Sequence, residues 1–265
     1  MNKLARFALY LAPLAILALP TVADADPFTW TGFYIGGNAG AGFGGESTSV
    51  DLEGFNYFVA NPVPGEVTRV GDDSAFIGGG QLGYNHAFNT IIVGIEADFS
   101  GFDFQAARIP PSSIADWGSD TRVSVEMNWL STVRGRLGVA MDRWLLYGTG
   151  GVAFSDGVYR NHDFCNTVPR CGGGLLDAKG DMDTGWTVGG GAEFAWMANW
   201  TAKAEYLFVR FDGDVYSGTA TYPAPRDPVS YRFSASPAEF NIVRVGLNYK
   251  FGKRYEAPLS EAPLK

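Results

Sequence analysis

The chain has 265 residues, with 20 lysine and arginine residues against 28 aspartate and glutamate residues, so its formal net charge is −8. An acidic chain has no electrostatic reason to bind nucleic acid, which argues against that class of partner. Glycine is abundant, at 35 residues, and aromatic residues make up 14% of the chain. This composition and length are consistent with one large all-β domain.

Residues 1–25 are predicted to form a secretory signal peptide. Lys3 and Arg6 give a positive start, the apolar stretch FALYLAPLAILALP follows, and Ala-Asp-Ala then supplies a small-x-small cleavage pattern. A membrane anchor is disfavoured, because Pro13 and Pro20 interrupt a run that is shorter than the roughly 20 residues needed to span a bilayer. The mature chain is therefore expected to enter an oxidising compartment.

Eight later segments alternate apolar and polar residues, a period typical of β-strands with one apolar face. Their apolar faces, in chain order, are Phe33, Ile35, Ala39, Ala41 and Phe43; Phe76, Leu82 and Tyr84; Ile91, Val93, Ile95, Ala97 and Phe99; Val125, Met127, Trp129, Val133, Leu137 and Val139; Trp144, Leu146, Val152 and Phe154; Trp186, Val188, Ala192, Phe194 and Trp196; Ala202, Ala204, Tyr206 and Phe208; and Val243, Val245, Leu247, Tyr249 and Phe251.

The connections between these strands alternate in length. Short ones, HAFNT, AMDR and MANW, begin at His86, Ala140 and Met197, and long ones are expected near residues 44–74, 105–122, 156–183 and 212–237. Antiparallel strands joined alternately by short periplasmic turns and long extracellular loops are the topology of an outer-membrane barrel. The predicted fold over residues 26–251 is thus an all-β, eight-stranded antiparallel transmembrane β-barrel.

The stretch FYIGGNAGAGFGG also matches a nucleotide-binding fingerprint, through Gly40, Gly42 and Gly45. That fingerprint needs a helix directly after it to bind phosphate, and no helical pattern follows here. We interpret the glycines instead as residues that thin the inner face of a tight barrel and let the strand bend.

Three features favour a barrel with its apolar face in lipid over a soluble sandwich. The polar face is rich in small residues, which suits the narrow interior of an eight-stranded barrel. Its charges balance, as a confined interior requires, because an unpaired buried charge is costly. The apolar face carries aromatic residues near the strand ends, as interfacial girdles do. These girdle residues are Phe33, Phe43, Trp144, Phe154, Trp186, Trp196, Tyr249 and Phe251.

The polar faces supply ten charged residues for a predicted network inside the barrel. Arg134 and Arg136 are predicted to pair with Glu96, Asp98 and Glu126 of neighbouring strands, since opposite charges across a ladder attract. The full predicted set is Glu96, Asp98, Glu126, Glu193 and Glu205 with Arg134, Arg136, Lys203, Arg244 and Lys250.

Several segments resemble a known family, the outer-membrane immunogenic proteins, or porin-family proteins, of alphaproteobacteria. They are WTGFYIGGNAGAGFG, NWLSTVRGRLGVAMDRWLLYGTGGVAF, GWTVGGGAEFAWMANWTAKAEYLFVRF and VRVGLNYKF. The resemblance implies a surface-exposed, eight-stranded barrel that contributes to envelope integrity, and it implies no catalytic residues. Such barrels usually end at the terminal aromatic residue, whereas residues 252–265 follow Phe251 here. Because these residues include Pro258 and Pro263, which disfavour a further strand, they are predicted to form a periplasmic tail.

Cys165 and Cys171 are the two cysteines of the chain. In an exported protein their spacing predicts a disulfide bond. A metal site is the competing interpretation, but with His162 as the one nearby histidine the ligands are too few. No metal or cofactor is therefore expected.

An enzyme is disfavoured because the histidines, His86 and His162, lie in connections away from any nucleophile and orienting group. The favoured function is a structural outer-membrane barrel that presents surface loops. A narrow pore and a surface adhesin or ligand-binding barrel stay open as alternatives. The expected partners are outer-membrane lipid and lipopolysaccharide, with the barrel-assembly machinery and periplasmic chaperones in transit; the oligomeric state stays open.

Overall fold

The computed structural model describes residues 28–53, 67–71, 73–109, 122–164, 175–221 and 228–251. Within these ranges, no helix has the length and hydrophobicity needed to cross a membrane. The strands are β1 (Gly32–Glu53), β2 (Val67–Val70), β3 (Asp73–Phe88), β4 (Ile91–Arg108), β5 (Arg122–Met141), β6 (Trp144–Phe164), β7 (Leu175–Ala195), β8 (Trp200–Phe211), β9 (Val215–Ala220), β10 (Val229–Ala235) and β11 (Ala238–Lys250).

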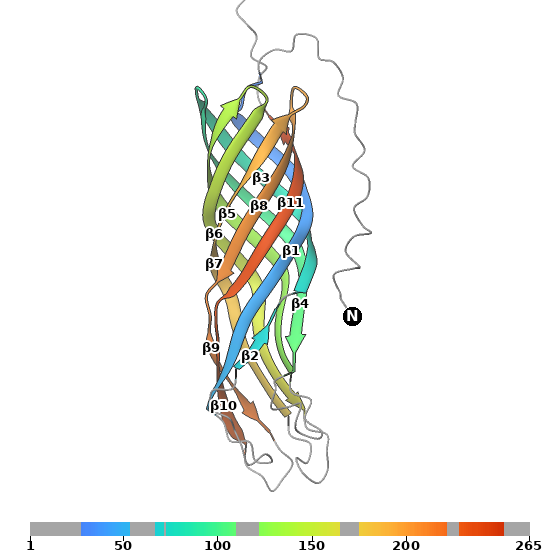
Figure 1. Ribbon diagram of the computed structural model, residues 1–265, viewed down its shortest axis with the longest axis vertical. Helices are drawn as coiled ribbons and strands as arrows, with labels where there is room; N and C mark the ends of the chain where they lie inside the picture. Colours follow the sequence, from blue (N-terminus) through green and yellow to red (C-terminus); the bar gives the residue numbers. More distant parts are fainter. Residues whose placement is uncertain are drawn as a thin grey trace, which may run out of the picture. The chain divides into compact units, whose positions relative to one another are not determined.

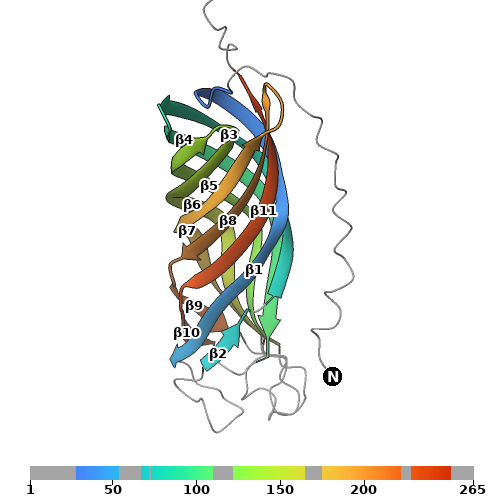
Figure 2. The same cartoon turned by 45° about the horizontal axis from the view of Figure 1, so that its top comes forward.

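Eight of these strands close into a barrel, as Figures 1 and 2 show. Strands β3 to β8 each pair antiparallel with the next, β8 pairs with β11, and β1 closes the ring between β11 and β3. The closing ladder runs from the pair Tyr34–Lys250 to the pair Glu46–Glu239. The predicted eight-stranded antiparallel barrel is therefore confirmed.

All three short turns lie at one end of the barrel, the upper end in Figure 1, which we call the short-turn end. Two of them, at 89–90 and 142–143, place Asn89 and Asp142 at positive φ angles of 57° and 53°. Asparagine and aspartate tolerate this conformation better than other residues with a side chain. The short turns thus fall close to the predicted positions.

The opposite, long-connection end differs from the prediction, because strands continue into the segments expected to be loops. β1 runs on to Glu53 and β6 to Phe164, and β2, β9 and β10 lie wholly inside predicted loops. β10 extends the wall by pairing with β1 from Ser49–Ala235 to Glu53–Arg232, and β9 pairs with β10. The prediction ended each strand where its apolar outer face ended, although backbone pairing does not depend on which face is apolar.

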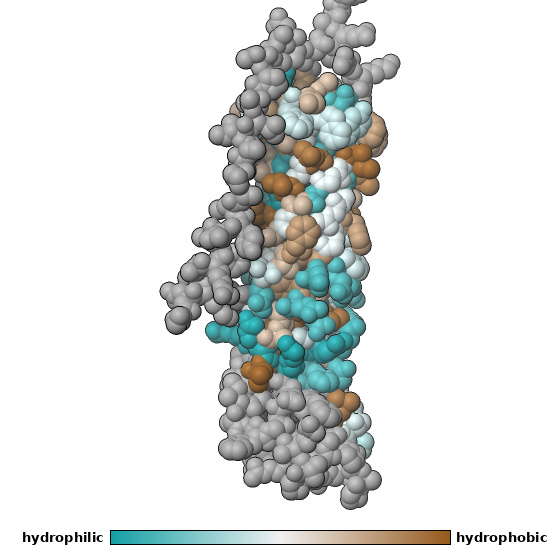
Figure 3. All heavy atoms as spheres, turned by 90° about the vertical axis from the view of Figure 1, so that its right-hand side faces the viewer, coloured by the Kyte–Doolittle hydropathy of each residue, from teal (hydrophilic) through white to brown (hydrophobic). Residues whose placement is uncertain are grey.

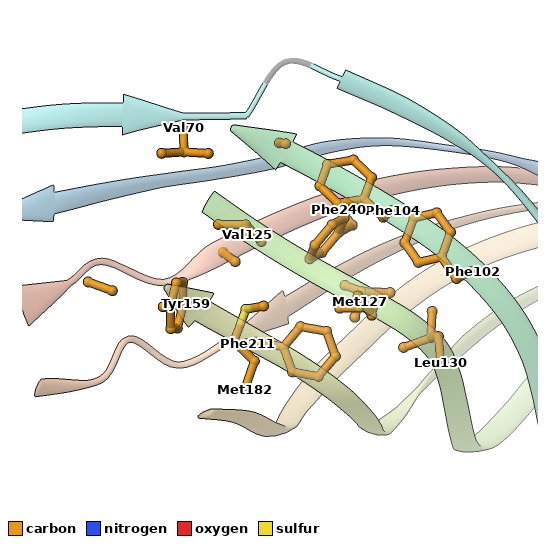
Figure 4. Close-up of a cluster of buried hydrophobic side chains, with 14 of the residues drawn as sticks. Val70, Phe102, Phe104, Val125, Met127, Leu130, Tyr159, Met182, Phe211 and Phe240 are labelled. Carbon is orange, nitrogen blue, oxygen red and sulfur yellow. The ribbon is translucent and has the colours of Figure 1, made fainter. Parts of the chain in front are cut away.

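The polarity of the wall inverts part of the way along the strands. Towards the short-turn end, large apolar side chains point outwards and polar ones point into the bore. Beyond Ser100 of β4 the inward positions become apolar, beginning with Phe102 and Phe104, which are buried. Figure 4 shows these rings packed with Val125, Met127, Leu130, Phe211 and Phe240. We call this group the distal apolar cluster.

The outer wall changes in the opposite sense. On the face drawn in Figure 3, hydrophobic and near-neutral side chains occupy the upper part of the barrel, and a hydrophilic band follows towards the long-connection end. This upper apolar band is the surface predicted to face lipid. The long-connection half therefore has an apolar interior and a polar exterior, as a water-soluble barrel has.

The inversion on β5 corrects one prediction. Val125 and Met127 were expected on the outer apolar face, but both side chains are buried in the distal apolar cluster. A bulge at Asn128 and Trp129 inserts one extra residue between Glu126 and Leu130, opposite β6. Because side chains alternate with a period of two, one inserted residue moves every later side chain to the other face.

Asp156 of β6 holds this bulge in place. Its Oδ1 accepts hydrogen bonds from the backbone amides of Asn128 (2.9 Å) and Trp129 (3.0 Å), and its Oδ2 accepts one from the Asn128 side chain (2.9 Å). Partial burial opposes ionisation of Asp156, but these hydrogen bonds outweigh it and lower the pKa of its carboxyl group. The residue lies beyond the apolar outer band, on the polar part of the wall.

We expect the stability that Asp156 contributes to be present above the pKa of an unfolded aspartate, about 3.9, and to be lost as the pH falls through its lower folded value. Asp156→Ala should lower the free energy of unfolding by about 1 kcal/mol at pH 7, because exposed hydrogen bonds compete with water. Urea titrations of wild type and variant at pH 7 and pH 3 measure this. A difference of equal size at both pH values would contradict it.

Inward glycines create the space that the prediction ascribed to them. A Cβ at Gly40 would collide with the carbonyl oxygen of Val243, and one at Gly79 with that of Phe99. The outward-facing Gly37 has room for a side chain, since a Cβ added there would lie in ordinary van der Waals contact, 3.6 Å from the carbonyl oxygen of Gly79. Crowding of neighbouring strands therefore accounts for glycine on the inner face.

Candidate functional site

Eight charged side chains meet inside the bore, and we call them the charge network. Each is at most 4% exposed to solvent. Four are acids and four are bases, so the network carries no formal net charge. The members are Glu96 and Asp98 of β4, Arg134 and Arg136 of β5, Glu193 of β7, Lys203 and Glu205 of β8, and Arg244 of β11.

Arg134 lies at the centre of the network. Its Nη2 contacts Glu96 Oε1 and lies 2.9 Å from Asp98 Oδ2, and its Nη1 lies 3.0 Å from Glu205 Oε1. Its Nε donates to Thr132 Oγ1 at 2.9 Å, and that hydroxyl donates to Asp98 at 2.6 Å. Every nitrogen of this guanidinium group therefore has an acceptor, which offsets the large penalty of burying it.

Two cations from other strands bind the same carboxylates. Lys203 Nζ lies 2.9 Å and 3.0 Å from the two oxygens of Glu96. Arg244 lies 3.1 Å and 3.2 Å from the oxygens of Asp98 and 2.7 Å from Glu205 Oε2. Since β11 and β8 lie across the bore from β4, these contacts tie opposite walls of the barrel together.

Arg136 extends the network towards the short-turn end. Its Nη2 lies 2.7 Å from Glu193 Oε2, and its Nη1 donates to the Tyr34 hydroxyl, which donates to Glu96, both at 2.8 Å. Its guanidinium carbon lies 3.9 Å from the centre of the Tyr147 ring, a cation–π contact. Tyr34 and Tyr147 stand on polar faces of the period-2 pattern, but nothing in the pattern gave them a role.

Neutral polar side chains fill the space beside the charges. Glu193 accepts hydrogen bonds from Thr201 (2.5 Å) and Asn248 (3.0 Å). Gln81 donates to Asn248 at 2.6 Å and accepts from Asn38 at 3.1 Å. The polar layer therefore reaches from β7 and β8 across β11 to β1 and β3.

Two residues predicted for the network lie outside it. The prediction for Glu126 is wrong: beyond the β5 bulge its side chain is on the outer wall, where it lies 3.7 Å from Arg160. Lys250 is buried and close to the network, but its Nζ donates to the carbonyl oxygen of Thr31 at 2.5 Å. The balanced set is thus four acids and four bases instead of five of each.

The short-turn end of the bore is closed by an apolar group, the mouth cluster. Trp30, 4% exposed, packs here against Ile92, Leu145, Tyr147 and Ala195, with Phe28 beside it. The Ala87 amide donates to Thr31 Oγ1 at 2.9 Å and fixes the segment in place. Residues 28–31 precede the first alternating strand, and the period-2 pattern carries no signal for this role.

The predicted girdle residues all point outwards, between 36% and 66% exposed. Phe33, Trp144, Trp196, Tyr249 and Phe251 lie towards the short-turn end, and Phe43, Phe154 and Trp186 lie near the level of the inversion. The outer surface between these two sets is apolar, about as wide as the roughly 25 Å band of an outer-membrane barrel.

Three predictions fall outside the described residues: the signal peptide at 1–25, the disulfide between Cys165 and Cys171, and the tail at 252–265. Within the described ranges, no group of three histidine, cysteine, aspartate or glutamate side chains is arranged to hold a metal ion. Chemically, the charge network is a balanced set of buried ion pairs that lies between the mouth cluster and the distal apolar cluster.

Comparison with known proteins gives a consistent result. A family model described as an outer membrane protein beta-barrel domain matches residues 9–251. The 31 kDa outer-membrane immunogenic protein of Brucella melitensis is 35% identical over 236 residues, covering 88% of each chain. The 22 kDa outer membrane protein of Rhizobium leguminosarum bv. viciae is 27% identical over 227 residues, covering 84% of this chain and 79% of the relative.

Solved structures with a similar course of the chain include two other barrels. The outer membrane protease OmpT of Escherichia coli matches with a TM-score of 0.49 and 9% identity, over 88% of this chain and all of the other. The outer membrane protein OprG of Pseudomonas aeruginosa matches with a TM-score of 0.48 and 12% identity, over 84% of this chain and 99% of the other.

Proposed function

Because this chain belongs to the outer membrane protein β-barrel family and lies in the outer membrane, we propose that it is a structural, non-conducting barrel that supports the envelope. One observation supports the proposal: three groups of buried side chains, the mouth cluster, the charge network and the distal apolar cluster, follow one another along the bore. Wide aqueous channels take sixteen or more strands, whereas eight leave room only for packed side chains.

The long-connection half supports a second part of the same proposal, the presentation of surface segments. In such barrels the long connections are extracellular and the short turns periplasmic. With about 3.3 Å of rise per residue and a tilt near 40°, the ten residues of β6 from Ser155 to Phe164 extend about 25 Å beyond the apolar band. A polar-walled stalk with an apolar core would carry the ends of these strands above the bilayer.

Conductance tests the closed bore. Refolded full-length protein added to a planar lipid bilayer should give a trace indistinguishable from that of protein-free lipid, while a sixteen-stranded porin in the same chamber gives discrete steps. Discrete steps from the purified protein, absent when it is heat-denatured, would overturn the closed barrel and favour the narrow-pore alternative.

The envelope role needs a cellular measurement. Deleting the gene should increase leakage of a periplasmic marker enzyme and sensitivity to detergent, and the full-length chain supplied in trans should restore both. Leakage unchanged by the deletion would remove the envelope role while leaving the closed barrel intact.

A further inference from the structure

A pocket of about 340 Å³ opens on the outer wall near the long-connection end, lined by residues of β3, β4 and β5. It arises from the cross-strand register. Ala107 and Ser124 face each other and form a floor of small side chains, and Gln105 faces Glu126 one step nearer the apolar band. Arg122 lines the pocket at its far end. We call this site the outer-wall pocket.

The two ends of the pocket have opposite charge. At the near end, Glu126 accepts a hydrogen bond from Ser124 Oγ at 3.1 Å and has a long contact, 3.7 Å, with Arg160. At the far end, Arg122 makes no hydrogen bond or ion pair with any residue in the described part of the chain. Its guanidinium group lines the pocket, and arginine binds a carboxylate through two parallel hydrogen bonds.

Arg108 is a fixed wall of the pocket. Its Nη2 donates to the carbonyl oxygen of Gly71 at 2.7 Å, and its Nη1 lies 3.3 Å from Asp73 Oδ2. The β3–β4 ladder ends at the pair Ile77–Phe102, so this side chain bridges the space where the two strands separate. The lining contains four charged residues whose formal charges cancel, namely Asp73, Arg108, Arg122 and Glu126. A simple anion therefore gains little electrostatic attraction from the pocket.

The height of the pocket identifies what can reach it. Gln105 lies six residues beyond Phe99, which is outward-facing and apolar, so the pocket begins about 15 Å above that level for a tilted strand. In the outer leaflet this is the level of the lipopolysaccharide sugars. The volume lies at the lower end of the range of about 300–1,000 Å³ for small-molecule sites.

We propose that the outer-wall pocket binds an acidic sugar of lipopolysaccharide, with the sugar carboxylate on Arg122 and its hydroxyl groups on Glu126 and Gln105. A pocket without net charge, with the carboxylate of Glu126 at one end and the guanidinium of Arg122 at the other, selects a ligand that carries both an anion and hydroxyl donors. The inference rests on the outer-membrane orientation in the proposed function, and it adds a lipid partner to it.

Calorimetric titration of the refolded full-length chain in micelles with lipid-free core oligosaccharide of lipopolysaccharide tests the site. Wild type should bind, and Arg122→Gln and Glu126→Gln should each weaken binding at least tenfold. Ala107→Trp, which fills the floor and keeps every charge, should abolish it. Arg210→Gln is the matched control, since Arg210 is a similarly exposed guanidinium whose Nη1 lies 3.1 Å from Glu239.

Three outcomes would overturn the site. Wild type could fail to bind, Arg122→Gln and Ala107→Trp could bind as tightly as wild type, or inorganic phosphate could compete as strongly as the sugar does. A soluble uronic-acid oligosaccharide that binds more tightly than the core oligosaccharide would place the ligand outside the membrane and refute the lipopolysaccharide source. The conductance measurement tests the proposed function independently of this site, because Arg122 has no part in closing the bore.

Discussion

Arg134→Ala is expected to lower the free energy of unfolding by about 3–5 kcal/mol, because it leaves Glu96, Asp98 and Glu205 buried without their shared cation. Lys203 and Arg244 stay in contact with the same carboxylates, so the barrel should still fold. Urea titration of the refolded protein in lipid vesicles, followed by tryptophan fluorescence, measures the change.

Arg210→Ala is the control for this variant, since it removes a guanidinium from an exposed pair with Glu239. Such pairs contribute about 0–1 kcal/mol. The double variant Arg134→Met with Asp98→Leu should recover part of the loss, because it removes a cation together with one of its acids. Equal destabilisation by Arg134→Ala and Arg210→Ala would show that the buried ion pairs contribute no more than a surface pair.

Val133→Arg is expected to cost about 2–4 kcal/mol, the penalty for arginine near the midplane of an outer-membrane barrel. Val133 is 40% exposed on the apolar band, and Val93, at 44%, should respond in the same direction. Asp103→Arg on β4 is the control, because Asp103 also faces outwards but lies beyond the inversion. If Val133→Arg unfolds at the same urea concentration as wild type, the band does not face lipid.

The strands of the membrane half could be predicted because one face of each strand is apolar over many residues. The alternation correctly placed Glu96, Asp98, Arg134 and Arg136 together on one face of the wall and Val133 on the opposite face. Which face is inside followed from the small residues and from the balance of charge, both of which reflect the narrow bore.

The long-connection half was mispredicted for a non-local reason. Whether β5 is continuous or bulged depends on Asp156, which lies 28 residues from Asn128 along the chain and meets it only once β6 has paired. The prediction for Glu126 assumed an uninterrupted strand and therefore placed its side chain on the wrong face. Likewise, the cations that bind Asp98 include Arg244, 146 residues away, which only closure of the barrel brings near.

The partners of Arg134 could be foreseen only in part. Glu96 and Asp98 lie on the adjacent strand, where cross-strand pairing is a local rule. Glu205 comes from β8, across the bore, and its contact depends on the diameter of the barrel. The pairing of Arg136 with Tyr34 and Glu193 is of the same kind.

The inversion of wall polarity makes leaving the membrane slow. For the barrel to slide out through its periplasmic side, the outward charges beyond the apolar band, among them Asp103, Arg160, Asp177 and Lys179, must enter hydrocarbon. At the midplane of a barrel, arginine and lysine each oppose this by about 2–4 kcal/mol, and aspartate by less. We therefore expect the polar wall beyond the band to slow both insertion into bare lipid and extraction from it, because the same charges must cross the hydrocarbon in each direction.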